Sequence, residues 1–327
     1  LILKANDNIT NEKDINIYNT KNIGMRVDFG QSNTDDNSAR LLPTAINKGN
    51  ISITDGEQNI GMVSNNSSTD TVSVNNETVM KHRAVAINET AGNILFNNVS
   101  KKAIGMFAKK GGEIINKGNI KGGSTALEET IGMVIQPASG TQVANGTNSG
   151  TIELKGKKVT GVYNQGKFAM TDGSILTSGE KSISIYANNG STTKISKGIV
   201  AAENGALGLF ADDTVIELGA NSGSDAPVLK GNGIGTLLFY NYTKNGTTYN
   251  FSGKFQLNQN VNGNLTNGAS AFYYKDLSTS TLISQKLNDM FAHTTGSAAG
   301  KKLKLSLDDN STLFVLENTT PSPTTIN

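Results

Sequence analysis

The sequence lacks cysteine and tryptophan, and it has only two histidines and 5 prolines among 327 residues. Without thiols there is no disulfide framework, no cysteine-based zinc site and no cysteine nucleophile. The absence of cysteine also suits a chain that crosses an oxidising periplasm before folding, where stray disulfides would block export. Apolar runs are short, Ile131–Ile135 being typical, so no segment approaches the roughly 20 residues that cross a bilayer.

Charge is also scarce and balanced, with Lys+Arg 29 and Asp+Glu 27. A nucleic-acid partner is therefore not expected, because binding phosphates requires a concentrated excess of cations. The abundant residues are glycine, with 36 copies, and asparagine, with 41. Both tolerate positive φ and form tight turns, so the composition predicts a turn every few residues.

A block of the form apolar–Gly–apolar–apolar returns along the chain at intervals of 23 to 29 residues in its central part. Its clearest copies contain Ile23-Gly24-Met25, Ile60-Gly61-Met62, Ile104-Gly105-Met106, Ile131-Gly132-Met133, Thr160-Gly161-Val162 and Leu207-Gly208-Leu209. Degenerate copies are expected at 84–87, 183–186, 234–237 and 269–272. A periodicity of this length is typical of solenoid proteins, in which each repeat stacks on its neighbours.

A second block, Asn/Ser-x-Gly-x-Ile, lies between these copies, as at 47–51, 116–120 and 148–152. A third short strand, such as 112–116, completes each period. Three short strands per period predict an all-β fold, a right-handed parallel β-helix of about ten rungs covering residues 1–275. Asparagines at equivalent turns should form a hydrogen-bonded ladder. The apolar residues expected to point inward are Met62, Met106, Met133, Val162, Leu209 and Leu237.

The pattern weakens near residue 275, and an antiparallel sandwich stays open as an alternative fold. Residues 282–291 have the apolar spacing of a short amphipathic helix, and 303–307 and 313–316 resemble strands. A hairpin turn is expected at 308–310. We therefore expect 276–327 to form a cap or interruption of the β-helix, followed by a disordered tail.

The two repeats, the Asn/Lys-rich turns and the missing cysteine resemble the passengers of type V autotransporters. The Asn-, Lys- and Ile-rich repeats are most similar to those of the very large autotransporter adhesins of fusobacteria, over about residues 1–275. The resemblance implies a signal peptide and a C-terminal membrane barrel outside this segment, a location at the bacterial surface, and attachment to host proteins, host glycans or other bacteria. It carries over no binding motif.

Residues suited to catalysis are few, and we expect no catalytic residue, metal or cofactor. The histidines, His82 and His293, lie far apart in the repeat order, and His82-Arg83 is expected to be an exposed turn. A polysaccharide lyase or glycoside hydrolase on a β-helix is the alternative function, since clustered carboxylates would serve acid–base chemistry. The adjacent pairs that could contribute are Asp35-Asp36, Glu128-Glu129, Asp212-Asp213 and Asp308-Asp309. Neighbours in a strand point to opposite faces, which favours solvated turns for all four.

Aromatic residues crowd residues 239–255 of a chain that is only 6% aromatic, and 272–274 follow. Residues 241–246 are predicted to form a protruding loop, because this period is longer than the others. Tyrosine combines stacking area with a hydroxyl, which suits contacts with glycans or proteins. The candidate binding residues are therefore Tyr240, Tyr242, Lys244 and Tyr249. Packing of these rings against the end of the rod stays open. A second polar excursion is expected at 30–40.

Overall fold

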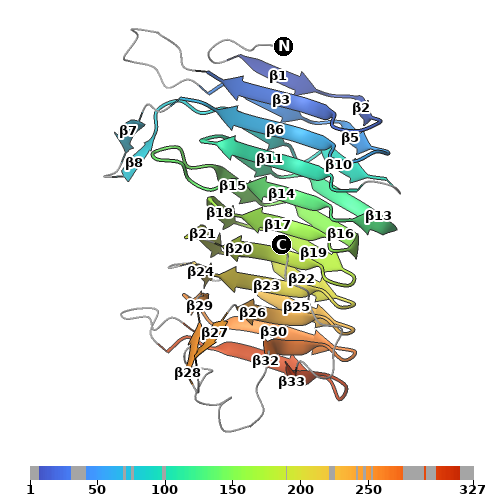
Figure 1. The fold of residues 1–327 in the computed structure, drawn as a ribbon, viewed down its shortest axis with the longest axis vertical. Coiled ribbons are helices and arrows are strands. Elements are labelled where there is room, and N and C mark those ends of the chain that lie inside the picture. Colours follow the sequence, from blue (N-terminus) through green and yellow to red (C-terminus); the bar gives the residue numbers. More distant parts are fainter. Residues whose placement is uncertain are drawn as a thin grey trace.

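The protein is a three-sided parallel β-helix in which the chain winds from one sheet to the next and returns to each sheet one strand further along the rod (Figure 1). The computed structural model describes residues 7–30, 42–68, 71–74, 77–97, 101–188, 190–220, 225–240, 242–245, 248–251, 253–274, 291 and 300–316. Within the three long sheets, A, B and C, each strand is parallel to the strands beside it, and every turn of the chain adds one strand to each sheet.

The strands of the three sheets follow one another in chain order. Sheet A contains β1 Asn8–Asn11, β4 Thr44–Asn47, β9 Val85–Asn88, β12 Glu113–Asn116, β15 Asn145–Asn148, β18 Lys167–Met170, β21 Thr192–Ile195, β24 Val215–Leu218 and β29 Lys254–Leu257. Sheet B contains β2 Asp14–Ile17, β5 Asn50–Ile53, β10 Asn93–Phe96, β13 Asn119–Glu128, β16 Thr151–Lys157, β19 Ser174–Ser178, β22 Ile199–Glu203, β25 Val228–Asn232, β30 Val261–Thr266 and β32 Leu303–Leu307. Sheet C contains β3 Ile23–Phe29, β6 Ile60–Asn66, β11 Ile104–Lys110, β14 Ile131–Ile135, β17 Thr160–Asn164, β20 Ile183–Asn188, β23 Leu207–Asp212, β26 Thr236–Tyr240, β31 Ser270–Tyr274 and β33 Thr312–Leu316.

These strands form nine complete rungs, numbered 1 to 9 from the N-terminus, and a tenth that has strands in sheets B and C. The predicted parallel β-helix is confirmed, and it continues past residue 275. The hairpin predicted at 308–310 is wrong: β32 pairs with β30, and β33 pairs with β31. The turn at 308–310 is thus a corner between two sides of one rung. The helix predicted at 282–291 lies outside the described residues, except for Phe291, which bridges to Phe255.

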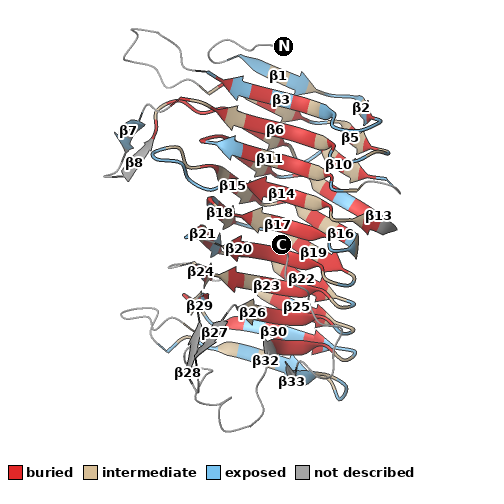
Figure 2. Cartoon of the chain, viewed as in Figure 1, coloured by how far each residue is buried: buried red, intermediate tan, exposed pale blue. Residues whose placement is uncertain are grey.

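Inward-pointing aliphatic side chains form one continuous core along the rod. The residues predicted to point inward, Met62, Met106, Met133, Val162, Leu209 and Leu237, are all buried. In sheet B the stacked isoleucines Ile51, Ile94 and Ile120 are fully buried. The strands of the first and last rungs carry more exposed residues than those between them (Figure 2). Each rung therefore buries its apolar face against the rungs on either side.

The glycine of the Ile-Gly-Met block is required by the closeness of neighbouring rungs. A Cβ on Gly132 would lie 2.5 Å from the carbonyl oxygen of Gly161 and 2.8 Å from Cγ2 of Ile152. The same column holds Gly24, Gly61, Gly105 and Gly161 in the first five rungs and then Ser184, Gly208, Leu237 and Ala271. Two predicted copies of the block are corrected here. The copy predicted at 84–87 falls on β9 of sheet A, and Leu237 rather than Gly235 takes the glycine position of its rung.

The predicted asparagine ladder is present at the corner between sheets A and B, where the Asn-x-Gly turn begins. Each amide Nδ2 donates to the Oδ1 of the asparagine in the next rung, at 2.8 Å in every step. The ladder consists of Asn11, Asn47, Asn88, Asn116 and Asn148. Paired amides remove the cost of burying polar groups, so this column lies inside the rod. From rung 6 onward the same position is apolar, with Met170, Ile195, Leu218 and Leu257.

Candidate binding surface

The longest connections within the nine complete rungs, 30–43, 67–84 and 241–253, all join sheet C to sheet A. We call this corner the C–A edge. At several other rungs the same corner is short, as at 111–112, 165–166 and 213–214, and at 136–144 it is of intermediate length. Insertions are thus concentrated on one edge of the rod. Loops carried by a rigid scaffold are the usual place for binding residues. The excursion predicted at 30–40 falls here, and its residues 31–41 lie outside the described part.

The predicted loop at 241–246 is the first half of an antiparallel hairpin formed by β27 (Tyr242–Asn245) and β28 (Thr248–Phe251). The pairing register places Tyr242 opposite Phe251 and Lys244 opposite Tyr249. Residues directly opposite one another, and those two apart in a strand, share one face of an antiparallel ribbon. Three of the four predicted binding residues thus occupy one face of the hairpin, and Tyr240 ends the preceding strand β26.

The aromatic cluster that pointed to this region divides among three places. Phe255 and Phe272 belong to the core. Phe239 packs edge-on against Phe210, with ring centroids 4.5 Å apart, at the end of a column on the outer side of sheet C. Of the aromatic residues in 239–255, those of the hairpin and Tyr240 belong to neither group and stay candidates for contact with a partner.

The column on sheet C stacks Tyr163, Tyr186, Phe210 and Phe239 in four successive rungs. The first two ring pairs are nearly parallel, with centroids 5.2 and 4.7 Å apart. Burial raises the pKa of the hydroxyls of Tyr163 and Tyr186, and the Tyr186 hydroxyl donates to Asp212 at 3.0 Å. Because these rings pack on one another, the column holds successive rungs together. In the sequence, Tyr163, Tyr186 and Phe210 all occupy the fourth position of the apolar–Gly–apolar–apolar block, and this repetition indicates the column.

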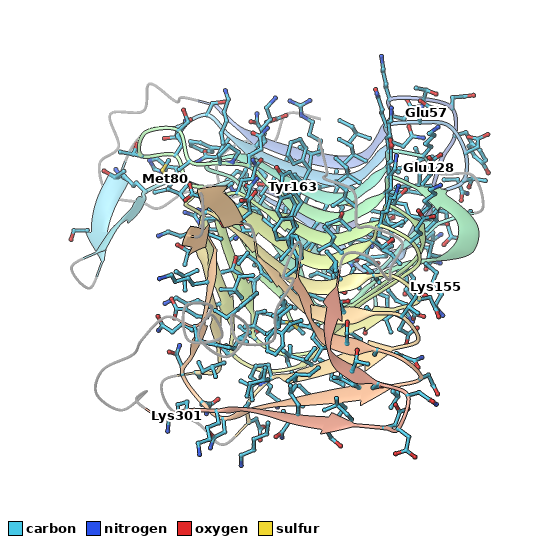
Figure 3. The ribbon with its side chains drawn as sticks, turned by 60° about the horizontal axis from the view of Figure 1, so that its bottom comes forward. Glu57, Met80, Glu128, Lys155, Tyr163 and Lys301 are labelled. Carbon is cyan, nitrogen blue, oxygen red and sulfur yellow. The ribbon has the colours of Figure 1, made fainter. Side chains whose placement is uncertain are left out.

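A second hairpin, β7 (Thr71–Val74) with β8 (Glu77–Met80), projects from the C–A edge between rungs 2 and 3. Both hairpins lie on the left-hand side of Figure 1. In Figure 3, the label Met80 marks the base of the β7–β8 hairpin. Sequence analysis did not find this element. The prediction of an exposed turn at His82-Arg83 is wrong, because both residues are buried at the hairpin base. His82 stacks on Phe29 at 5.3 Å, and Arg83 pairs with Glu113 at 3.3 Å.

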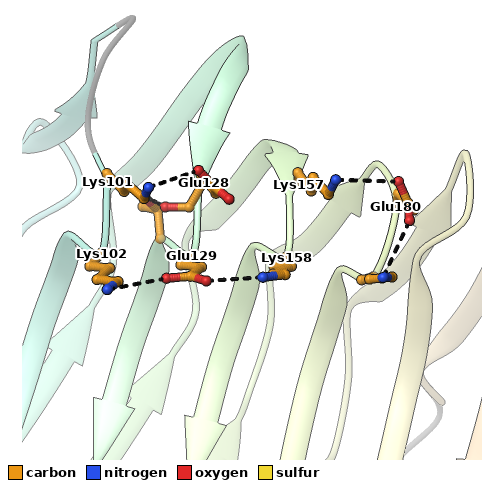
Figure 4. Close-up of polar contacts among 9 residues, drawn as sticks. Lys101, Lys102, Glu128, Glu129, Lys157, Lys158 and Glu180 are labelled. Carbon is orange, nitrogen blue, oxygen red and sulfur yellow. Dashed lines mark hydrogen bonds and ion pairs between the residues drawn. The ribbon is translucent and has the colours of Figure 1, made fainter. Parts of the chain in front are cut away.

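The carboxylate pair Glu128-Glu129 belongs to a ladder of alternating charge along the corner between sheets B and C (Figure 4). Lys101 pairs with Glu128 at 3.2 Å, and Glu129 lies between Lys102 at 3.7 Å and Lys158 at 3.1 Å. The hydrogen bond from Lys158 lowers the pKa of Glu129, and that to Glu128 raises the pKa of Lys101. Figure 3 shows Glu57, Glu128 and Lys155 along this side. The pair is therefore used in rung stacking, with each carboxylate bound to lysines of a neighbouring rung.

The other carboxylate pairs are also separate from one another. Asp212 accepts the Tyr186 hydroxyl. Asp308 accepts hydrogen bonds from the Ser311 hydroxyl within its own turn and from the backbone N–H of Asn267 in the neighbouring rung. Asp35-Asp36 and His293 lie outside the described residues. Among the residues that the structure does describe, no three His, Cys, Asp or Glu side chains are arranged to hold a metal ion, and no helix is long and apolar enough to cross a membrane.

No protein-family model, curated protein or solved structure shows a significant match to the chain. The fold and its surfaces therefore carry the functional argument.

Proposed function

We propose that this chain is a non-enzymatic segment of a bacterial cell-surface adhesin, which attaches to a host-cell protein or glycan, or to another bacterium. The observation that carries the proposal is the contrast between a repetitive rod and a single edge from which both antiparallel hairpins project. Backbone groups and buried asparagines are paired from rung to rung, so the rod holds these insertions at fixed spacing.

The hairpin β27–β28 is the proposed contact region, with Tyr240, Tyr242, Lys244 and Tyr249 as its anchors. Lys244 pairs with Tyr249 across the hairpin, and Tyr242 lies two residues before Lys244 in β27, so three of the four candidates belong to neighbouring register positions. Tyrosine is enriched among the residues that contribute most of the binding energy at protein interfaces. An enzyme is less well supported, because the described carboxylate pairs contact lysines or turn groups rather than converging.

The test compares adhesion of the purified chain to epithelial cells and to other bacteria with that of the Tyr242→Ser/Tyr249→Ser variant. We expect at least about tenfold weaker binding at an unchanged melting temperature, since one anchor contributes about 2 kcal/mol. The control variant replaces residues 71–80 by a two-residue turn. It removes the other hairpin, β7–β8, and leaves β27–β28 in place. A large fall in melting temperature with binding per folded molecule intact would show that the tyrosines are structural. Absence of binding to every surface by the unmodified chain would refute the adhesin proposal.

A further inference from the structure

A shallow groove of about 600 Å³ crosses the outer face of sheet B over rungs 5 to 9. It is distinct from the hairpins, which leave the rod at the C–A edge. We call it the sheet B groove, and its floor is formed by Leu176, Ile199 and Ala201. Its rim consists of Thr151, Glu153, Ser174, Glu203, Lys230, Asn232, Asn264 and Thr266.

The groove arises from the sequence of outward positions in one column of sheet B. That column reads Glu153, Leu176, Ala201, Lys230 and Asn264 in successive rungs. A small residue at rung 7 lies between longer side chains on either side, so the surface dips at Ala201. Parallel pairing repeats the same column about every 4.8 Å along the rod. The groove therefore presents similar side-chain positions at regular intervals.

Its chemistry excludes several classes of partner. The strands beneath it pair on both sides, as β22 does with β19 and β25, so no edge is open to an added peptide strand. The charges are balanced, because Glu153 and Glu203 line the groove together with Lys230, and Lys155 beside the groove lies 3.0 Å from Glu153. A polyanion or polycation would meet repulsion from part of this set.

Hydrogen-bonding capacity surrounds the aliphatic floor. Lys230 and Asn264 make no side-chain hydrogen bond or ion pair with any residue in the described part of the chain. The Oδ1 of Asn232 accepts a hydrogen bond from the side-chain amide of Asn267 at 2.8 Å, so the Nδ2 of Asn232 points away from Asn267. Donors and acceptors around an apolar strip match a ligand that has CH surfaces and many hydroxyls.

We propose that the sheet B groove binds a neutral, linear glycan lying along the rod axis. The CH faces of successive sugars rest on Leu176, Ile199 and Ala201, and their hydroxyls bond to Glu203, Lys230 and Asn264. This site is separate from the hairpin proposed above and does not depend on it.

The test titrates the purified chain with neutral oligosaccharides built from hexoses and N-acetylhexosamines, selected on an array that also carries acidic glycans. Ala201→Phe fills the groove from an outward position, and we expect at least tenfold weaker binding. Ser52→Phe is the matched control, because Ser52 occupies the same column at rung 2, outside the groove. It should bind like the unmodified chain, and both variants should keep its melting temperature.

Three results would overturn the proposal: no neutral oligosaccharide binds, Ala201→Phe binds as well as Ser52→Phe, or only acidic glycans bind and Lys230→Gln abolishes that binding. If Ala201→Phe lowers the melting temperature, Glu203→Gln replaces it and should weaken binding without filling the groove. An unchanged affinity in that variant would also count against the site. The hairpin variant Tyr242→Ser/Tyr249→Ser should keep full glycan binding, so the two proposals fail independently.

Discussion

Rungs 1 to 5 and rungs 6 to 9 have the same three-stranded architecture, but their cores are built differently. The first five rungs hold the buried asparagine ladder and an uninterrupted glycine column. The later rungs replace the asparagines with Met170 and aliphatic residues and relax the glycine column at Ser184 and Leu237. They also carry most of the outer aromatic column, which begins at Tyr163 in rung 5. The same rung geometry thus allows two kinds of side chain at the corner between sheets A and B: hydrogen-bonded asparagines or apolar residues.

The largest expected effect separates these two corners. Asn116→Leu removes the donor to Asn148 and the acceptor of Asn88, both of them buried. Unpaired buried amides cost about 1–3 kcal/mol each, so we expect a loss of about 3 kcal/mol in the free energy of unfolding. Met170→Leu, at the same register position in rung 6, should cost less than about 1.5 kcal/mol. Chemical denaturation measures both, and equal losses would contradict the distinction.

The glycine column provides the next comparison. Gly132→Ala places a methyl group against the carbonyl of Gly161, and overpacking of this kind costs about 2 kcal/mol. Ser184→Ala, in the same column, keeps a tolerated Cβ and loses only the hydroxyl contacts to Ala201 and Thr177. We expect about 1 kcal/mol there. If Gly132→Ala is neutral in thermal unfolding, the rungs can separate more easily than the structure implies.

The aromatic column should contribute less per residue. Tyr186→Leu removes two ring contacts, each contributing about 0.5–1.5 kcal/mol beyond burial. We expect a loss of about 1–2 kcal/mol in unfolding free energy for this variant. Tyr186→Phe keeps the rings and loses the hydroxyl bond to Asp212, so it should be the milder change. The opposite order of stability would mean that the hydroxyl, rather than the stacking, holds this column.

The charge ladder should give the smallest effect. The pKa of Glu129 is lowered in the folded chain. Its ionised carboxylate therefore stabilises the fold at pH values above the ordinary carboxyl pKa of 4.5, and this stabilisation is lost as the pH falls through the folded pKa. Because the side chains are partly exposed, solvent screening limits it to less than about 1 kcal/mol. Thermal unfolding of Glu129→Gln should match the unmodified chain at acid pH and fall slightly below it at neutral pH. A deficit that grows at acid pH would contradict the sign.

Much of the rod could be predicted from sequence because its constraints repeat. Ile-Gly-Met marks a carbonyl too close for a side chain, and Asn-x-Gly marks a paired amide followed by a tight turn. Residues 234–237 were misaligned because Leu237 occupies a position that earlier rungs reserve for glycine. The turn at 308–310 was assigned to a hairpin because a sequence does not show whether two strands pair or form successive sides of a rung.

The binding surface was only partly predictable. The long period before residue 271 revealed an insertion, whereas the burial of His82 depends on Phe29, which lies far from it in sequence. The sheet B groove had no sequence signal, because its residues come from five periods and none is unusual in its own strand.

The most direct test of uniform rung stacking measures two distances in one outward column of sheet B. Asn16, Glu153 and Asn264 occupy that column at rungs 1, 5 and 9. Because the chain has no cysteine, pairs of introduced cysteines can carry spin labels without background. Four rungs separate the two labels of each pair. Double electron–electron resonance should therefore give the same distance for Asn16→Cys/Glu153→Cys and for Glu153→Cys/Asn264→Cys, about 19 Å before allowance for the label linkers. Clearly unequal distances, or a broad distribution in either half, would contradict a single rung geometry across the two kinds of core.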